Sequence, residues 1–325
     1  MIRRRRWLAA ASVPLLAPLV NSVRAESYPT KPIRFLNPFQ AGSNGDTAPR
    51  LVLQRAAETL GQPFVIESHQ GGSAMLAMRT LAASRPDGYT VGLGTPGNVI
   101  TGFLTMRDPG FEVERLEPIT LICETPLVLS VTNSLPVNSV QELIAYGKAN
   151  PGKLNYAYDG VGATTHLAAE LLLQTAGVVA QGVSYKGGAG GYTTDFVSGR
   201  IHFAIGGIGV PLGLHRSGQL RIIAVCGDKR VPTLPQIPTV AQQGFPGFDA
   251  SSWFAVFAPR GVPRDAFNRL GRELRSAVEH PDVSARLSEA GFLPLVSSSE
   301  VLKEKMARER AKWTTVAANA GVAKQ

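Results

Sequence analysis

Short apolar runs alternate with segments whose apolar residues recur at helical spacing along the N-terminal part of this 325-residue chain. The runs at 32–36, 64–66 and 89–93 predict strands, and the segments at 51–60 and 74–84 predict helices. Such an alternation is typical of an α/β fold. We therefore expect mostly parallel sheets with helices on both faces.

The alternation continues through the middle of the chain. Residues 119–131 form a long β-branched run without helical periodicity, which predicts a strand that crosses from one lobe to another, and residues 252–258 predict the return crossing. Between them we expect helices at 140–149, 166–175 and 192–197 and strands at 154–158, 178–185 and 201–205. Two C-terminal helices, at 264–279 and 301–318, should pack back on the first lobe.

The two crossings divide the chain into two expected lobes. Residues 26–123 together with 250–325 would form lobe 1, and residues 124–249 would form lobe 2. The roughly 300 residues that follow the first 25 are enough to bury a core in each of two domains.

The first 25 residues have the pattern of an export signal. Arginines at Arg3 to Arg6 precede an apolar stretch at 7–20, and a small-residue cleavage signal ends at Ala25. The apolar stretch is too short for a convincing membrane span. We expect export to the periplasm with cleavage after Ala25, by either a Sec or a twin-arginine route.

The charge of the chain argues against a nucleic-acid partner. The formal net charge is +9, but the leader contains five of the 33 basic residues and none of the 24 acidic ones, so the remainder carries only +4. No basic cluster with interleaved aromatic residues is present. A mildly positive balance is compatible with a small anionic ligand.

Signatures of catalysis and of metal binding are missing. The sequence has no G-x-S-x-G, P-loop, H-E-x-x-H or C-x-x-C motif, and its five histidines are scattered, so we expect no metal and no cofactor. A Ser-His-Asp site assembled from distant residues stays open. Cys123 and Cys226 could pair in an oxidising compartment, but both lie in strand-like runs, which favours two buried free thiols.

Four Gly-rich turns, at 42–46, 71–73, 160–165 and 186–191, each join a predicted strand to a predicted helix. Glycine lets backbone N–H groups approach a guest closely, and a helix N-terminus carries partial positive charge. Such turns can bind a carboxylate or phosphate. Each could also be an ordinary β–α connection, but four in one chain favour a function.

Particular residues in these turns are candidates for ligand contact. Asp46 is expected to cap its helix, because a carboxylate would repel an anion. Thr164 and Thr165 are expected to donate to a ligand, His166 either donates or caps, and Lys186 could form an ion pair or stay solvated. The candidate set is Phe39, Gly42, Ser43, Asp46, Gly71, Gly72, Ser73, Thr95, Asn98, Gly162, Thr164, Thr165, His166, Tyr185, Lys186 and Gly206.

Thr95 and Asn98 belong to this set because of a further turn. Residues 92–97 match the dinucleotide pattern G-x-G-x-x-G, but they follow the third predicted strand rather than the first, and Pro96 alters the turn. We interpret this segment as another ligand-facing turn.

Many short motifs, in order, resemble Bug-type receptors, the periplasmic solute-binding proteins of tripartite tricarboxylate transporters. They include Pro29-Thr30-Lys31-Pro32-Ile33-Arg34, Leu60-Gly61-Gln62-Pro63, Arg85-Pro86-Asp87-Gly88-Tyr89-Thr90, Asn150-Pro151-Gly152-Lys153-Leu154-Asn155-Tyr156, Thr165-His166-Leu167-Ala168, Tyr185-Lys186-Gly187 and Ser251-Ser252-Trp253-Phe254. The resemblance implies a two-lobed Venus-flytrap fold of the type II periplasmic-binding-protein kind. It also implies capture of a small organic acid, held by backbone amides and water, for delivery to membrane transporter subunits.

The chain departs from the family pattern at three places, one of which is the second turn, where Ser68-His69-Gln70-Gly71-Gly72-Ser73-Ala74 replaces the usual Asn-Arg-Pro-Gly-Ala-Gly-Gly. The usual Pro-Pro-Gly-Gly of the first turn is Gln40-Ala41-Gly42-Ser43 here. The acidic residue that often follows the strand ending at Ile205 is replaced by Gly206-Gly207. This loss leads to the hypothesis that ligands with an amino group are disfavoured and that uncharged or purely anionic ligands are favoured.

The sequence therefore predicts a binding protein without catalytic activity, most simply a monomer. Two other functions stay open: a periplasmic hydrolase that uses His166 or Lys186, and a receptor that presents its ligand to a sensor kinase.

Overall fold

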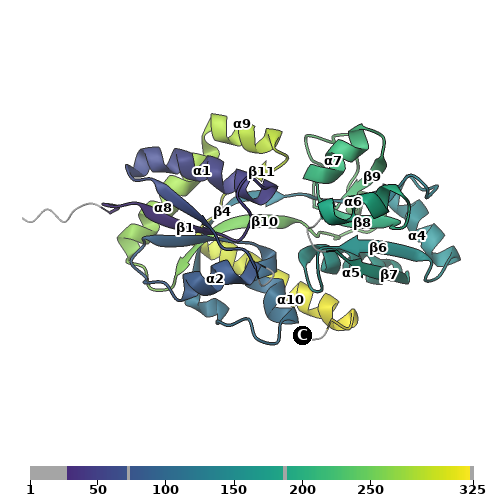
Figure 1. Ribbon diagram of the computed structural model, residues 1–325, viewed down its shortest axis with the longest axis horizontal. Coiled ribbons are helices and arrows are strands. Elements are labelled where there is room, and N and C mark those ends of the chain that lie inside the picture. The colour runs from purple at the N-terminus through teal and green to yellow at the C-terminus, as the bar shows by residue number, and fades with distance from the viewer. Residues whose placement is uncertain (1–27, 72–73, 186–188, 323–325) are drawn as a thin grey trace, which may run out of the picture.

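Two β-sheets, each covered by helices on both faces, form the two lobes of the molecule (Figure 1). The computed structural model describes residues 28–71, 74–185 and 189–322. The lobe 1 sheet has the order β11-β4-β10-β3-β1-β2, with β1 (Ile33–Asn37), β2 (Phe64–Ser68), β3 (Thr90–Gly94), β4 (Leu116–Thr125), β10 (Ser252–Pro259) and β11 (Leu293–Pro294). The lobe 2 sheet has the order β7-β6-β8-β5-β9, with β5 (Leu127–Thr132), β6 (Leu154–Tyr158), β7 (Ala180–Ser184), β8 (Phe203–Gly207) and β9 (Leu220–Val225).

The two-lobed α/β fold is confirmed, but both sheets are mixed rather than mostly parallel. β1 pairs in parallel with β2 and β3, and β6 with β7 and β8, whereas β5, β10 and β11 pair antiparallel with their neighbours. The reason lies in the crossings. The β–α units of each lobe run toward the other lobe, whereas β5 and β10 enter their lobes from the side where the lobes meet and so run the opposite way.

The apolar run at 119–131 forms two strands rather than one. Pro126 has no backbone N–H to donate, and β4 ends just before it while β5 begins just after it. β4 belongs to the lobe 1 sheet and β5 to the lobe 2 sheet, so the chain passes between lobes at this proline.

Helices cover both faces of each sheet. In lobe 1, α1 (Asn44–Leu60), α8 (Arg264–Glu279) and α9 (Pro281–Glu289) pack on one face, and α2 (Met75–Ala82), η2 (Gly97–Thr101), α3 (Gly102–Thr105) and α10 (Ser299–Asn319) on the other. In lobe 2, α4 (Val140–Ala149) and α5 (Thr164–Ala176) lie opposite α6 (Ala189–Val197) and α7 (Gly209–Arg216). Short 3₁₀ turns, η3 (Val113–Arg115) and η4 (Ala241–Gln243), complete the described elements. The sequence did not predict α7, α9 or the η2–α3 segment.

The last helix contacts both lobes, whereas the sequence placed it on lobe 1 alone. α10 packs on β4 of lobe 1 and on α5 of lobe 2, and Gln174 donates a hydrogen bond to the carbonyl of Val316 (3.1 Å). One apolar core consequently runs through both lobes on this side and includes Trp313 of α10 and Leu173 of α5. This continuous core holds the lobes together on the side that α10 covers (Figure 1).

Both cysteines are buried and unpaired, as the sequence favoured. Burial raises the pKa of the Cys123 and Cys226 thiols, so they remain protonated and behave as small apolar side chains. Over the described residues, no helix is both long and apolar enough to cross a membrane, and no group of His, Cys, Asp and Glu could hold a metal ion.

Candidate functional site

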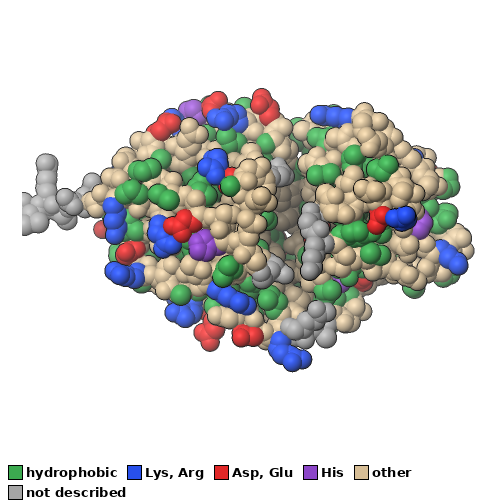
Figure 2. All heavy atoms as spheres, in the orientation of Figure 1, with side chains coloured by type: hydrophobic (Ala, Val, Ile, Leu, Met, Phe, Trp, Pro, Cys, Tyr) green, Lys and Arg blue, Asp and Glu red, His purple; other side chains and the backbone are tan. Residues whose placement is uncertain are grey.

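A cavity of about 550 Å³ lies between the lobes, and Figure 2 shows the molecule hollowed there. This volume is in the range of small-molecule sites. Its walls come from the segments that follow β1, β3 and β6, from the β4–β5 crossing, from the start of β10, and from the first residues of α2, α3 and α5. Ligands of α/β folds commonly bind beyond the carboxyl ends of strands, which is where most of these segments lie.

Two helices begin at this cavity without a side-chain cap. The N-cap residue is Ala163 in α5 and Ala74 in α2, and neither can accept a hydrogen bond through its side chain. Away from the cavity, α4 and α10 begin at Ser139 and Ser298, whose hydroxyls accept from first-turn amides, whereas α1, α8 and α9 also begin without a side-chain cap. First-turn N–H groups have no partner within their own helix. At the start of α5, where no described group accepts from Thr164, Thr165 or His166, these N–H groups therefore remain available to an anion.

The β6–α5 turn is held in shape by its own side chains. Gly162 adopts φ +75° and donates its N–H to Nδ1 of His166 (3.1 Å), and Asp159 donates its N–H to the Thr165 hydroxyl (3.2 Å). The imidazole of His166 stacks on Tyr158, with ring centroids 4.1 Å apart. Burial lowers the pKa of His166, so the ring stays neutral and Nδ1 can accept. His166 is buried behind the turn rather than in the cavity wall.

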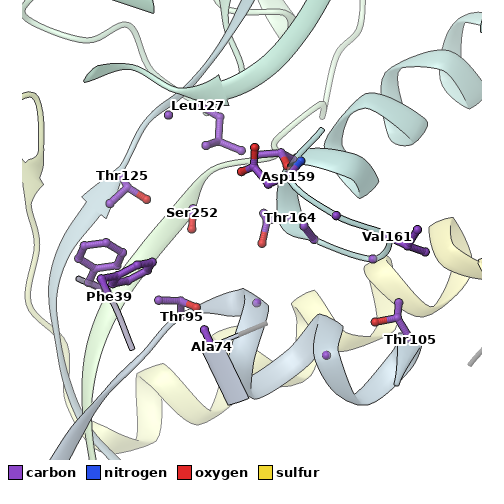
Figure 3. Close-up of a pocket in the computed structure, with 18 of the residues that line it drawn as sticks. Phe39, Ala74, Thr95, Thr105, Thr125, Leu127, Asp159, Val161, Thr164 and Ser252 are labelled. Atoms are coloured by element: carbon purple, nitrogen blue, oxygen red, sulfur yellow. Dashed lines mark hydrogen bonds between the residues drawn. The ribbon is translucent and has the colours of Figure 1, made fainter. Parts of the chain in front are cut away.

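An apolar wall and several hydroxyls face the same space. The rings of Phe39 and Phe254 lie with their centroids 5.6 Å apart, and a Cβ at Gly45 would clash with the Phe39 ring. Figure 3 shows the hydroxyls of Thr125, Thr164 and Ser252 around the cavity. The wall can contact the apolar part of a ligand, and the hydroxyls can donate to or accept from its polar groups.

Asp159 is the one charged residue among the described residues that line the cavity. Its side chain is exposed to the solvent between the lobes and projects into that space from the end of β6 (Figure 3). Desolvation by the surrounding protein raises its pKa, which a hydrogen bond with Thr165 only partly offsets. The sequence analysis missed this residue, although an acid directly after a strand and before Gly160 was a usable signal.

In the first Gly-rich turn, the structure gives Asp46 a different position from the predicted helix cap. Asp46 lies in the first turn of α1, not at its N-cap, which is Ser43. Its buried carboxylate accepts hydrogen bonds from Asn37 Nδ2 (2.9 Å), the N–H of Gly42 (2.9 Å) and the guanidinium of Arg50. Desolvation raises the pKa of Asp46, but these bonds outweigh it and hold the pKa below its usual range. Gly42, Ser43 and Asp46 do not line the cavity, since this turn is satisfied internally.

The other candidates separate into two groups. Phe39, Thr95, Gly162, Thr164 and Thr165 line the cavity. The described candidates that do not line it are Gly42, Ser43, Asp46, Gly71, Asn98, His166, Tyr185 and Gly206. Gly72, Ser73 and Lys186 lie outside the described residues.

Three candidates outside the cavity wall have structural contacts of their own. The side chain of Asn98 accepts from the N–H of Thr95 (2.7 Å) and donates to the carbonyl of Leu93 (3.1 Å), so it shapes the turn after β3. Tyr185 donates to Asp195 (2.7 Å). A Cβ at Gly206 would lie 2.9 Å from the hydroxyl of Tyr192, so a side chain at this position would require the Tyr192 ring to shift. The sequence analysis also missed the cavity-lining residues at the two crossings between the lobes, such as Thr125 and Ser252, because they come together only in the folded chain.

The sequence matches the family described as tripartite tricarboxylate transporter family receptor over residues 49–322. The protein BugT of Bordetella pertussis is 30% identical over 307 residues, which cover 94% of this chain and 94% of BugT. A protein encoded in the tcbD-tcbE intergenic region of Pseudomonas sp. strain P51 is 30% identical over 313 residues, 96% of this chain and 93% of that protein.

Solved structures agree with this match. R. palustris Rpa4515 with adipate is 35% identical, with a TM-score of 0.82 over 92% of this chain and 100% of that one. MatC from Rhodopseudomonas palustris with bound malate is 27% identical, with a TM-score of 0.76 over 89% and 99%. The periplasmic binding protein BugD is 29% identical, with a TM-score of 0.78 over 92% and 100%.

Proposed function

The chain belongs to the tripartite tricarboxylate transporter receptor family, and on that premise we propose that it captures a small carboxylate between its lobes. Binding would shift an open–closed equilibrium of the lobes toward the closed form. The bound acid would then be delivered to membrane transporter subunits. Relatives of similar fold are described with adipate and with malate, both of which are small carboxylates.

The observation that carries this proposal is the pair of uncapped helix starts at the cavity. α2 contributes from lobe 1 and α5 from lobe 2, so an anion between them meets, on both sides, first-turn N–H groups that no described side chain caps. No described residue that lines the cavity is cationic. Backbone amides and helix dipoles are therefore the groups of the described wall that attract a carboxylate.

The hydrolase alternative lacks support in the described residues. His166, its suggested base, lies outside the cavity wall, and its Nδ1 already accepts the N–H of Gly162. Lys186, the other suggested group, is outside the described residues. No observation favours presentation to a sensor kinase. We propose a receptor without catalytic activity, acting in the periplasm as a monomer after cleavage behind Ala25.

Thermal shift of the protein from Glu26 onward, measured against a panel of small carboxylates, tests the proposal. Ligand at about 100 times Kd stabilises by about 2.7 kcal/mol. The most informative variant is Ala163→Asp, which supplies the side-chain N-cap that α5 lacks. A capping side chain adds about 1 kcal/mol to the unliganded protein, but its carboxylate occupies the amides that the ligand needs.

We therefore expect Ala163→Asp to raise the Tm of the unliganded protein and to abolish the ligand-induced shift. Ser139→Ala is the matched control, because it removes a cap from α4 away from the cavity and should lower Tm without changing affinity. Unchanged carboxylate affinity in Ala163→Asp would show that the α5 amides are not the anion site. Failure of every carboxylate to bind the wild type would overturn the proposed function.

A further inference from the structure

The described wall of the cavity has an uneven charge distribution. Backbone N–H groups at the starts of α2 and α5 provide hydrogen-bond donors, whereas Asp159 provides a carboxylate that can only accept when ionised. No ion pair joins Asp159 to another described residue. A ligand in this cavity therefore meets donors and a separate anionic acceptor.

Closure of the lobes should increase the desolvation cost of the Asp159 carboxylate. In the structure Asp159 is an exposed residue, although the surrounding protein already desolvates its carboxyl group in part. When the lobes close on a ligand, the remaining solvent is displaced, and a buried carboxylate without a charged partner costs several kcal/mol, which the hydrogen bond with Thr165 offsets only in part. The ligand has to supply the partner, because site groups that stay unpaired reject ligands without the matching donor.

A dicarboxylate has no positively charged group that could pair with Asp159. One of its carboxylates can bind the free amides, but the other adds a second negative charge to the space that Asp159 occupies. Like charges placed together in an interface cost several kcal/mol. An ammonium group has the opposite effect, since it donates charge-assisted hydrogen bonds to Asp159.

We propose that Asp159 is a specificity residue and that the cognate ligand is a zwitterion, with a carboxylate for the helix amides and an ammonium group for Asp159. The inference rests on the proposed function and narrows its ligand class. It reverses the hypothesis drawn from Gly206, which held that amino groups are disfavoured. The acid is absent after β8 but present after β6, and both strand ends reach the same cavity, where Gly207 and Asp159 are lining residues.

The position of Asp159 leaves room for two zwitterion geometries. It belongs to the same turn as the α5 amides, so an α-amino acid could place both of its head groups there. The α2 amides belong to the other lobe, so an ω-amino acid could instead span the cavity. Matched ligands separate these cases: glutarate against glutamate for an α-ammonium, and adipate against 6-aminohexanoate for a terminal one.

Isothermal titration calorimetry of these four compounds on the full mature protein gives the test. We expect one or both zwitterions to bind at least about 10-fold more tightly than the matched dicarboxylate. Asp159→Asn should weaken zwitterion binding by about 10- to 100-fold, because a hydrogen bond to a charged group contributes about 1.5–3 kcal/mol. The same substitution should strengthen dicarboxylate binding and so reverse the preference.

Two control variants locate the effect. Asp282→Asn removes the same charge from the exposed first turn of α9 and should leave the preference unchanged. Lys186→Met tests the turn that follows Tyr185, outside the described residues. A zwitterion preference that survives in Lys186→Met supports the inference, and a dicarboxylate preference that depends on Lys186 overturns it.

The outcomes also separate the inference from the proposed function. If the wild type prefers the dicarboxylates, or if Asp159→Asn leaves the preference unchanged, the specificity role is wrong while the carboxylate receptor stands. If neither these four compounds nor any carboxylate of the thermal-shift panel binds, both are wrong.

Discussion

Two aspartates in corresponding turns of the two lobes have opposite surroundings. Asp46 follows β1 of lobe 1 and is buried, with Asn37, Gly42 and Arg50 as partners. Asp159 follows β6 of lobe 2 and extends into the cavity without a described cationic partner. The same residue type thus stabilises a turn in one lobe and is available to a ligand in the other.

The pKa directions express this difference. Hydrogen bonds hold the pKa of Asp46 below its usual range despite desolvation, whereas desolvation raises the pKa of Asp159. Folding therefore favours the charge of Asp46 and opposes the charge of Asp159. A carboxylate that lacks a charged partner until its ligand arrives costs stability, and such a cost is typical of functional sites.

The largest effect is a loss of stability, expected when the hydrogen bonds to the Asp46 carboxylate in the turn after β1 are removed. Asp46→Ala leaves the buried Nδ2 of Asn37 and the part-buried N–H of Gly42 without an acceptor, so the free energy of unfolding should fall by about 3 kcal/mol. Urea denaturation at pH 7 measures this. Asp282→Ala, an exposed first-turn acid in α9, should change stability by less than about 0.5 kcal/mol. A similarly small change in Asp46→Ala would contradict the structural role.

The second-largest effect is a loss of ligand affinity, expected when the contact of the β6–α5 turn with lobe 1 is disturbed. A Cβ at Gly162 would clash with Thr105 of α3, and the positive φ adds strain. Gly162→Ala should therefore push the lobes apart and weaken ligand binding by about 10-fold or more, as measured by calorimetry. Gly177→Ala has a similar φ of +64° with open space around it, and it should cost stability without changing affinity. Equal affinities in the two variants would exclude contact between Gly162 and Thr105 as a determinant of closure.

The smallest effect is a gain in stability. Asp159→Asn removes a charge whose pKa is raised by desolvation, so the unliganded variant should melt at a higher temperature than the wild type at pH 7. The difference should disappear as the pH falls below the usual aspartate pKa of about 3.9, where the carboxyl is protonated in both states. Asp46→Asn should show the opposite sign at pH 7. Melting curves of both variants between pH 3 and pH 8 test this, and a loss of stability in Asp159→Asn at pH 7 would refute it.

The local pattern of apolar and polar residues was sufficient to predict most helices and strands of the fold. The helix expected at 264–279 is α8, and the strand expected at 154–158 is β6, because periodic apolar positions and turn residues act within a few residues of each other. α7 and α9 were missed, since each is short and begins next to Gly or Pro. The 119–131 run breaks into β4 and β5 at Pro126, a residue that cannot donate a backbone hydrogen bond within a sheet.

The sequence alone determined the family, the alternation of strands and helices, and the Gly-rich turns where binding residues were sought. These features depend on neighbouring residues or on motifs in order. Only the tertiary structure decided which turns face the cavity, that Asp46 is satisfied by Asn37 and Gly42, and that Asp159 extends into the cavity. The physical reason is that burial and hydrogen-bond partners are properties of the assembled lobes, so identical aspartates in similar turns acquire different roles.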